Sequence, residues 1–309
     1  MHTLAVPLLL AVGSLLALQA AANVQLSSAT GSPFGASTLQ LAIGALLLLG
    51  AAAVAGTLGA FDQLAEVTPW HLVGGVGSAV YITAGILLFP RLGAVVTVGL
   101  FITGQMLASL ALDGFGWLGV ERSALGAPEI VGAVGVAIGA ALIVRAQSGG
   151  AAVDTAVREG KRWFLLALAA GAVLPVQGAI NAQLRADLAA PVTVGAFSFV
   201  VATAAMALAL GWSVAVRHAP APRVAPLRRL PWWGWLGGLC GATYVTAVFL
   251  LIPEIGVAST VALTVAGQQI ASVFVDRYGL FRLPQRRISP VRLVGVGTLL
   301  AGVALVQVA

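Results

Sequence analysis

Long apolar runs separated by short polar segments make up most of this chain. Ten of these runs are close to the roughly 20 apolar residues that a helix needs to cross a bilayer. Because hydrocarbon cannot satisfy unpaired backbone groups, we expect each run to be an α-helix. The runs cover residues 4–22, 36–58, 71–89, 93–112, 127–146, 163–183, 192–216, 233–252, 256–275 and 289–308. The pattern therefore predicts an all-α membrane protein with ten transmembrane helices.

Composition excludes a water-soluble protein. Hydrophobic residues make up 60% of the 309 residues and charged residues only 8%, whereas a soluble domain carries about 25% charged residues. The net charge of +6 would suggest a nucleic-acid partner in a soluble chain. Here the basic residues lie between the apolar runs, where they set membrane topology. We therefore expect the lipid bilayer as a partner, and no nucleic acid.

The first apolar run has an alternative interpretation as a cleaved signal peptide. Ala20, Ala21 and Ala22 supply the small residues of a cleavage site. However, no Lys or Arg precedes the run, and its polar residues recur later in the chain. We interpret it as a retained membrane span.

The second half of the chain repeats polar residues of the first half at fixed offsets. The pairs 158 positions apart include Gln19/Gln177 and Asn23/Asn181. The pairs 163 positions apart include Trp70/Trp233, Gly74/Gly237, Tyr81/Tyr244, Gln105/Gln268 and Asp113/Asp276. Matching Gln, Asn, Tyr and Asp residues are hard to obtain by chance in so apolar a chain, so they predict an internal duplication.

Each repeat contains five predicted spans, and this odd number brings the chain to the opposite face of the membrane. The second repeat must then be inserted upside down, as in many secondary transporters. We expect a first five-helix repeat at 1–146, a cytoplasmic linker at 147–162, and a second, inverted repeat at 163–309.

Basic residues favour one orientation of this architecture. The connections after the third, fifth, seventh and ninth spans carry most of them, whereas the opposite face has only Arg122 and Arg185. Cytoplasmic loops are enriched in Lys and Arg. We therefore expect those four connections in the cytoplasm and both termini outside it.

Polar side chains within the spans are the candidate functional residues, because leaving them unpaired in hydrocarbon costs free energy. Interhelical hydrogen bonds are one explanation for them. Their recurrence on corresponding helices of both halves favours the other, a polar cavity at the repeat interface. The substrate-binding candidates are Gln19, Asn23, Tyr81, Gln105, Gln177, Asn181, Tyr244, Gln268 and Gln269.

Two acids end corresponding spans. Asp113 and Asp276 are candidates for a gate or a proton-responsive group, with an interfacial cap as the simpler explanation. No metal site, catalytic constellation or phosphate-binding loop is visible in the sequence, because the three histidines lie at helix ends or in loops. The sequence therefore predicts no cofactor and no enzymatic activity.

Several segments of the second half resemble a known family. They are residues 174–184, the Pro253–Gly256 turn, residues 267–272 and Asp276. Together they resemble the YdcZ-type inner-membrane exporters of the drug/metabolite transporter (DMT) superfamily, here in a fused two-half form. The resemblance implies a bacterial inner-membrane, multi-pass carrier that works by alternating access. It also implies a cavity lined mainly by spans 1, 3, 4, 6, 8 and 9, which carry the candidate residues.

The resemblance does not extend to one related mechanism. Small multidrug resistance proteins use a membrane-embedded glutamate in their first helix, whereas this chain has Gln19 and Gln177 in that region. We expect a secondary transporter that exports a small organic metabolite or drug, with or without proton coupling, as a monomer or a homodimer. A passive channel or facilitator, and a scaffold that transports nothing, are the alternatives.

Overall fold

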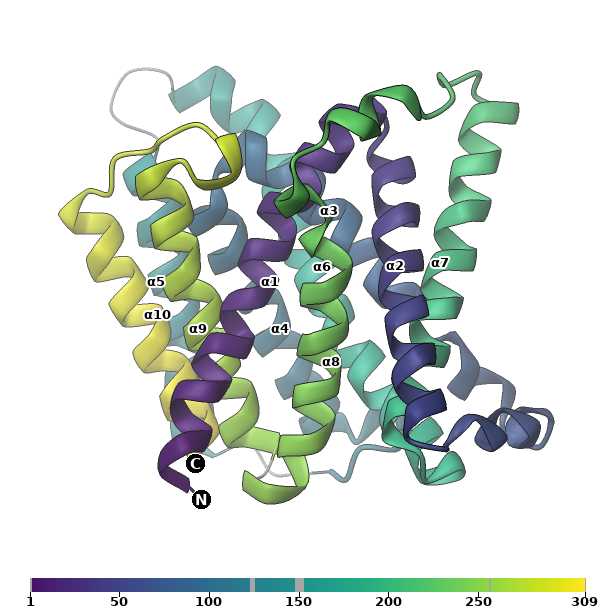
Figure 1. Ribbon diagram of the computed structural model, residues 1–309. Helices are drawn as coiled ribbons and strands as arrows, with labels where there is room; N and C mark the ends of the chain where they lie inside the picture. Colours follow the sequence, from purple (N-terminus) through teal and green to yellow (C-terminus); the bar gives the residue numbers. More distant parts are fainter. Residues whose placement is uncertain (1, 123–125, 148–152, 256, 309) are drawn as a thin grey trace.

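The computed structural model describes residues 2–122, 126–147, 153–255 and 257–308, and these residues form ten α-helices (Figure 1). The helices of the first half are α1 (His2–Thr30), α2 (Pro33–Val54), α3 (Val76–Leu92), α4 (Ala94–Phe115) and α5 (Ala127–Gln147). Those of the second half are α6 (Val153–Leu188), α7 (Pro191–Ala215), α8 (Leu236–Ile255), α9 (Val257–Tyr278) and α10 (Pro290–Val308). Each of the ten predicted runs therefore overlaps one of these helices, although α2 ends four residues before the end of its run and α3 begins five residues after the start of its run.

The predicted linker differs from the structure in extent. Helix α6 begins at Val153, inside the segment 147–162, of which residues 148–152 lie outside the described part of the chain. Arg and Lys, as at Arg158, Lys161 and Arg162, have high helix propensity although they are not hydrophobic. The helix therefore continues through this polar segment, whereas a prediction from hydropathy ends the span there. Pro175 lies within the continuous α6.

Local sequence explains where the helices begin and reverse. Ser32 caps α2 by accepting a hydrogen bond from the Gly35 amide at 3.1 Å, and Pro33 occupies the first helical position, where its missing N–H costs nothing. Gly93 separates α3 from α4 with a φ of 81°, a backbone conformation that glycine adopts without steric cost. Tight connections of this kind make sequential helices antiparallel neighbours.

The contacts between helices are similar in the two halves. Helix α1 packs on α8 and α9, and the corresponding α6 packs on α3 and α4. Helix α2 packs on its own counterpart α7, and α5 packs on its own counterpart α10. In Figure 1 the α2–α7 pair lies on the right and the α5–α10 pair on the left, with the remaining helices between them. Helices at corresponding positions in the sequence therefore make corresponding contacts.

Glycine permits the closest of these contacts. A Cβ at Gly139 of α5 would lie 2.5 Å from the Leu299 amide nitrogen of α10, and one at Gly302 would lie 2.6 Å from the Gly132 carbonyl. Only residues without a side chain allow two helix backbones to approach so closely, as is common between membrane helices.

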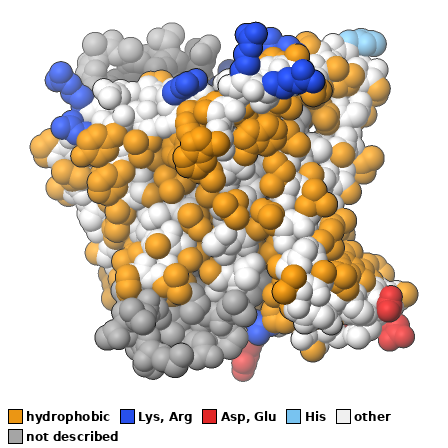
Figure 2. All heavy atoms as spheres, viewed as in Figure 1, with side chains coloured by type: hydrophobic (Ala, Val, Ile, Leu, Met, Phe, Trp, Pro, Cys, Tyr) orange, Lys and Arg blue, Asp and Glu red, His pale blue; other side chains and the backbone are white. Residues whose placement is uncertain are grey.

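The outer surface fits a membrane. Within the described residues, seven helices, α1 to α7, are long and apolar enough to cross a bilayer, and Pro290–Val306 of α10 is a shorter apolar helix. On the face drawn in Figure 2, most visible Lys and Arg side chains lie along the upper edge and the acids lie at the lower edge. Both termini lie at the lower end of the bundle (Figure 1).

Candidate functional site

The four amides predicted to share helix faces are all buried. Gln19 and Asn23 of α1 are 3% and 1% exposed, and Gln177 and Asn181 of α6 are 9% and 6% exposed. Each pair is four residues apart and therefore projects from one side of its helix. The two pairs face different partners.

The amides of α6 lie against α3 and α7 and are largely hydrogen-bonded. Gln177 exchanges two hydrogen bonds with Ser78: its Nε2 donates to Ser78 Oγ at 2.8 Å, and its Oε1 accepts from that hydroxyl at 3.1 Å. Asn181 Nδ2 donates to Ser198 Oγ at 3.1 Å. The Asn181 Oδ1 lies against Gly74, where any side chain would overlap it. Neither Ser78 nor Ser198 was singled out by the sequence.

The amides of α1 face α8 and α2 in the corresponding arrangement. The Asn23 Oδ1 lies against Gly237, the counterpart of Gly74, and Gln19 Nε2 would lie 2.8 Å from a Cβ at Gly241. Gln40 of α2 is fully buried, and its Nε2 donates to the Gly237 carbonyl at 3.4 Å. Both polar atoms of the Asn23 side chain and Gln40 Oε1 are buried without a hydrogen-bond partner.

A further hydrogen bond between the two halves joins α9 to α3. Gln268 Nε2 of α9 donates to the Tyr81 hydroxyl of α3 at 2.6 Å, and both residues are buried. The Tyr81 ring also packs against Phe101 of α4, with ring centroids 4.6 Å apart. Tyr81 is therefore held between an aromatic neighbour of its own half and an amide of the other half.

The counterparts of this pair are arranged differently. Tyr244 is only partly buried, and its hydroxyl bonds to Thr264 of its own half. Gln105, the counterpart of Gln268, is buried with Nε2 unpaired. Gln269 is fully buried and both its amide atoms lack a hydrogen-bond partner. A buried polar group without a partner costs about 1–3 kcal/mol, so these unpaired amide atoms lower the stability of the folded protein.

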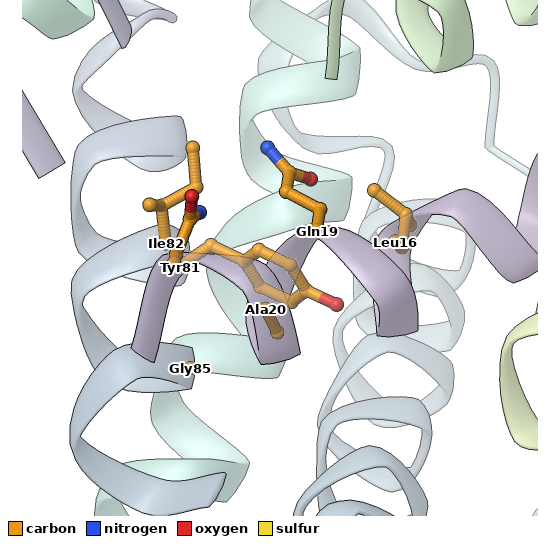
Figure 3. Close-up of a pocket in the computed structure, with 7 residues that line it drawn as sticks. Leu16, Gln19, Ala20, Tyr81, Ile82 and Gly85 are labelled. Carbon is orange, nitrogen blue, oxygen red and sulfur yellow. The ribbon is translucent and has the colours of Figure 1, made fainter. Parts of the chain in front are cut away.

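A small pocket joins part of the predicted set (Figure 3). Leu16, Gln19, Ala20 and Asn23 of α1 line it together with Tyr81, Ile82 and Gly85 of α3. The space open to the centre of a water molecule is about 10 Å³, and about 10–15 Å³ by that measure holds one water. The structure thus brings Gln19, Asn23 and Tyr81 together. Gln177 and Asn181 do not line this pocket: Gln177 bonds Ser78 of α3 and Asn181 bonds Ser198 of α7.

Asp276 lies at the end of α9 and is 2% exposed. Its carboxylate accepts hydrogen bonds from the Ala94 and Val95 amides at 2.7 and 3.1 Å and from Arg292 Nη2 at 3.2 Å. It therefore caps the N-terminus of α4, where a negative charge is favourable, and connects α4, α9 and α10. The side chain of Arg286 extends this cluster to the carbonyl of Arg91, at 3.3 Å.

Asp113 is in a different environment from its counterpart. It is only partly exposed near the C-terminal end of α4, 19 residues beyond Ala94. At 1.5 Å per residue this places the two acids about 28 Å apart along α4, at opposite ends of the bundle.

A further ion pair was not predicted. His71 Nδ1 lies 2.6 Å from Asp187 Oδ2, which ties the short helix Pro69–Val73 to the end of α6. The signal in the sequence was weak, because either residue alone resembles an ordinary helix-end group. In the described part of the chain, His, Cys, Asp and Glu nowhere gather in a group that could hold a metal ion.

A sequence model described as "Putative inner membrane exporter, YdcZ" matches residues 4–142 and 162–305, that is, both halves of the chain. No curated protein matches the chain.

Eight solved chains match the fold. One, described only as "Crystal structure of protein", has a TM-score of 0.57 and 20% sequence identity over 94% of this chain and 95% of its own. At that identity the likeness concerns the fold alone. The match to both halves, together with the apolar helices, shows that this membrane-embedded chain belongs to the YdcZ family of inner-membrane exporters in the drug/metabolite transporter group.

Proposed function

We propose that this protein is a secondary transporter that exports a small organic solute by alternating access, with its two halves acting as an inverted repeat. Family membership favours export. The solute would pass between the halves at the level of the pocket beside Tyr81. Ten membrane spans and the involvement of the polar residues named above are parts of this proposal.

The exchange of helix contacts between the halves supports an inverted repeat. Helices α1 and α6 make corresponding contacts, although one belongs to each half. Five helices per half return both termini to the same end of the bundle (Figure 1). We propose that the end carrying the α7–α8 and α9–α10 connections is cytoplasmic, because Arg223, Arg228, Arg282 and Arg286 lie there.

The bond between Tyr81 and Gln268 is the observation that carries the proposal of alternating access. In an inverted repeat, the two halves exchange conformations when the carrier changes from one access state to the other. A contact made by one half should then be replaced by its counterpart. Tyr81–Gln268 is made at 2.6 Å, while Gln105 keeps an unpaired Nε2. We infer that Gln105 bonds Tyr244 in the opposite state.

Asp276 is suited to act as a gate in this cycle. It holds the ends of three helices together at the proposed cytoplasmic end, and the pocket deeper in the bundle has room for about one water. We infer that this conformation is closed, and that opening toward the cytoplasm requires Asp276 to release α4. Asp113 would act correspondingly at the other end.

Flux measurements test this function. Metabolite and toxicant profiling of cells with and without the protein would identify candidate solutes, and purified protein in liposomes would then be assayed for their counterflow at several pH values. Saturable flux with counterflow supports a carrier. Flux that neither saturates nor shows counterflow would instead indicate a channel. If none of the profiled solutes shows flux, a scaffold that transports nothing would be the remaining alternative.

A pair of tyrosine substitutions tests the mechanism. Tyr81→Phe removes only the hydroxyl that accepts from Gln268, so we expect a several-fold change in the counterflow rate. Tyr278→Phe is the matched control, because Tyr278 is 58% exposed at the end of α9. Equal rates in both variants and the wild type would contradict the proposed role of the Tyr81–Gln268 bond.

A further inference from the structure

Asn23 and Asn181 occupy corresponding positions, but the protein satisfies them unequally. Asn181 Nδ2 donates to Ser198, and only its Oδ1 is without a hydrogen-bond partner. Asn23 is more deeply buried, at 1% exposure, and neither its Oδ1 nor its Nδ2 has a hydrogen-bond partner. The difference between the halves is therefore in the surroundings of the asparagine and not in the residue itself.

Two substitutions between the repeats produce this difference. At the offset of 163, Gly241 replaces Ser78, which removes the hydroxyl that pairs with Gln177 in the other half. At the offset of 158, Gln40 replaces Ser198. Gln40 does not bond Asn23: it reaches the Gly237 carbonyl instead, and its Oε1 stays unpaired.

The side chains of Asn23 and Gln40 both pack against Gly237. Asn23 Oδ1 lies against Gly237, and Gln40 Cγ would lie 2.9 Å from a Cβ at the same glycine. Asn23 also lines the pocket that Gln19 and Tyr81 enclose (Figure 3). Asn23 and Gln40 thus carry three buried polar atoms without partners, and Asn23, which carries two of them, lines the pocket. Because native proteins otherwise pair such groups, these atoms form an incomplete hydrogen-bonding site.

The chemistry of this site is neutral. The pocket is lined by apolar residues, glycine, two amides and a tyrosine, with no acid, Lys, Arg or His. The described ion pairs, at Asp276 and His71, lie at helix ends. A charged ligand would therefore be desolvated without compensation, whereas a neutral group that both donates and accepts would satisfy the amides.

We propose that Asn23 and Gln40 bind an uncharged carboxamide-type group of the substrate, and that this half-site, formed by α1, α2 and α8, is the main recognition site of the protein. A primary carboxamide presents one acceptor and two donors in a plane, which complements the free Oδ1 and Nδ2 of Asn23. The proposal rests on the proposed transport function. In the α6 half, Ser78 pairs with both polar atoms of Gln177 and Ser198 accepts from Asn181 Nδ2, which leaves only Asn181 Oδ1 without a partner among these two amides.

Thermal unfolding in detergent tests the unequal roles of the two asparagines. Asn181→Leu removes the 3.1 Å bond to Ser198 and leaves Ser198 only the 3.5 Å bond from Gln177. We therefore expect the midpoint to fall by about 2–4 °C, the effect of one lost hydrogen bond. Asn23→Leu removes two unpaired polar atoms at similar volume, so its midpoint should stay unchanged or rise. Asn23→Ala is a second variant that cannot overlap Gly237. If both Asn23 variants lose as much as Asn181→Leu, the protein satisfies Asn23 and the proposal fails.

Ligand-dependent stabilisation tests the chemical class. Nicotinamide and nicotinate are the probes, because they match in shape and differ in charge, and a ligand that binds the folded state raises the midpoint. We expect nicotinamide, and not nicotinate, to raise the midpoint of the wild type. That shift should disappear in Asn23→Leu and persist in Thr203→Val, whose hydroxyl bonds only its own helix at Phe199.

Each outcome bears on the proposal. No shift with nicotinamide, an equal shift with nicotinate, or a shift retained in both Asn23 variants would overturn the carboxamide site. Because these measurements need no flux, a failure of transport in liposomes would refute the proposed function separately. Conversely, transport that survives Asn23→Leu would refute only this half-site.

Discussion

Replacing Asp276 by asparagine should destabilise the protein far more than its small change in size suggests. The carboxylate accepts from two α4 amides and from Arg292. Asparagine can keep one acceptor, but it turns an amino group toward these donors and leaves the Arg292 guanidinium without its counter-charge. Asp276 and Arg292 side chains are only 3% and 4% exposed, so water cannot compensate.

The magnitude follows from the burial of this pair. Breaking a buried ion pair by removing one partner costs about 3–5 kcal/mol. In a chain of this order of size, each kcal/mol of lost stability lowers the unfolding midpoint by about 2–4 °C. The midpoint of Asp276→Asn should therefore fall by roughly 6–20 °C. The assay is thermal unfolding of purified protein in one detergent, followed by intrinsic tryptophan fluorescence.

Two further variants test whether the buried ion pair of Asp276 accounts for the loss. Asp113→Asn changes the corresponding, partly exposed acid and should cost less than about 1 kcal/mol. The double variant Asp276→Asn/Arg292→Met removes both charges and should recover much of the loss, because an apolar replacement of a buried pair is often tolerated. Equal losses at 113 and 276, or no recovery in the double variant, would refute the structural account of Asp276.

Three other predictions are independent of transport. Ser78→Ala should lower the unfolding midpoint by several degrees, because it leaves Gln177 Oε1 without a partner and Nε2 with only the 3.5 Å bond to Ser198; an unchanged midpoint would contradict that pairing. Gly139→Val should lower it much more, or prevent folding, since its Cβ would meet the α10 backbone at Leu299; Gly297→Val is the control, as nothing lies within 4 Å of that position. A reporter fused to the C-terminus and active only outside the cytoplasm should be active; a folded but silent fusion would reverse the proposed orientation.

Periodicity and repetition made much of this architecture predictable. Apolar runs of about 20 residues specify helices in any protein that enters a bilayer, because the backbone has no other way to pair its polar groups. The recurrence of Gln19 and Asn23 as Gln177 and Asn181 identified the buried amides before their surroundings were known. The end of the linker was less predictable, since polar helix outside the membrane carries no hydropathy signal.

The partners of the polar residues could not be predicted. Asp276 looked like an interfacial acid, but it caps a helix that begins 182 positions earlier in the chain, at Ala94. Likewise, the two asparagines look equivalent in sequence, while Ser198 pairs with one and Gln40 leaves the other free. Such contacts depend on which faces of α2, α7 and α8 turn inward.

The sequence by itself determined the membrane environment, the helices, the duplication and the family, because these depend on composition and on spacing along one chain. The tertiary structure decided which buried amides are hydrogen-bonded, which acid is held by hydrogen bonds and an ion pair, and how little space remains between α1 and α3. These features are set by distances of a few ångströms between helices far apart in sequence. A glycine in place of a serine, as at Gly241 and Ser78, changes them without altering the pattern of apolar runs.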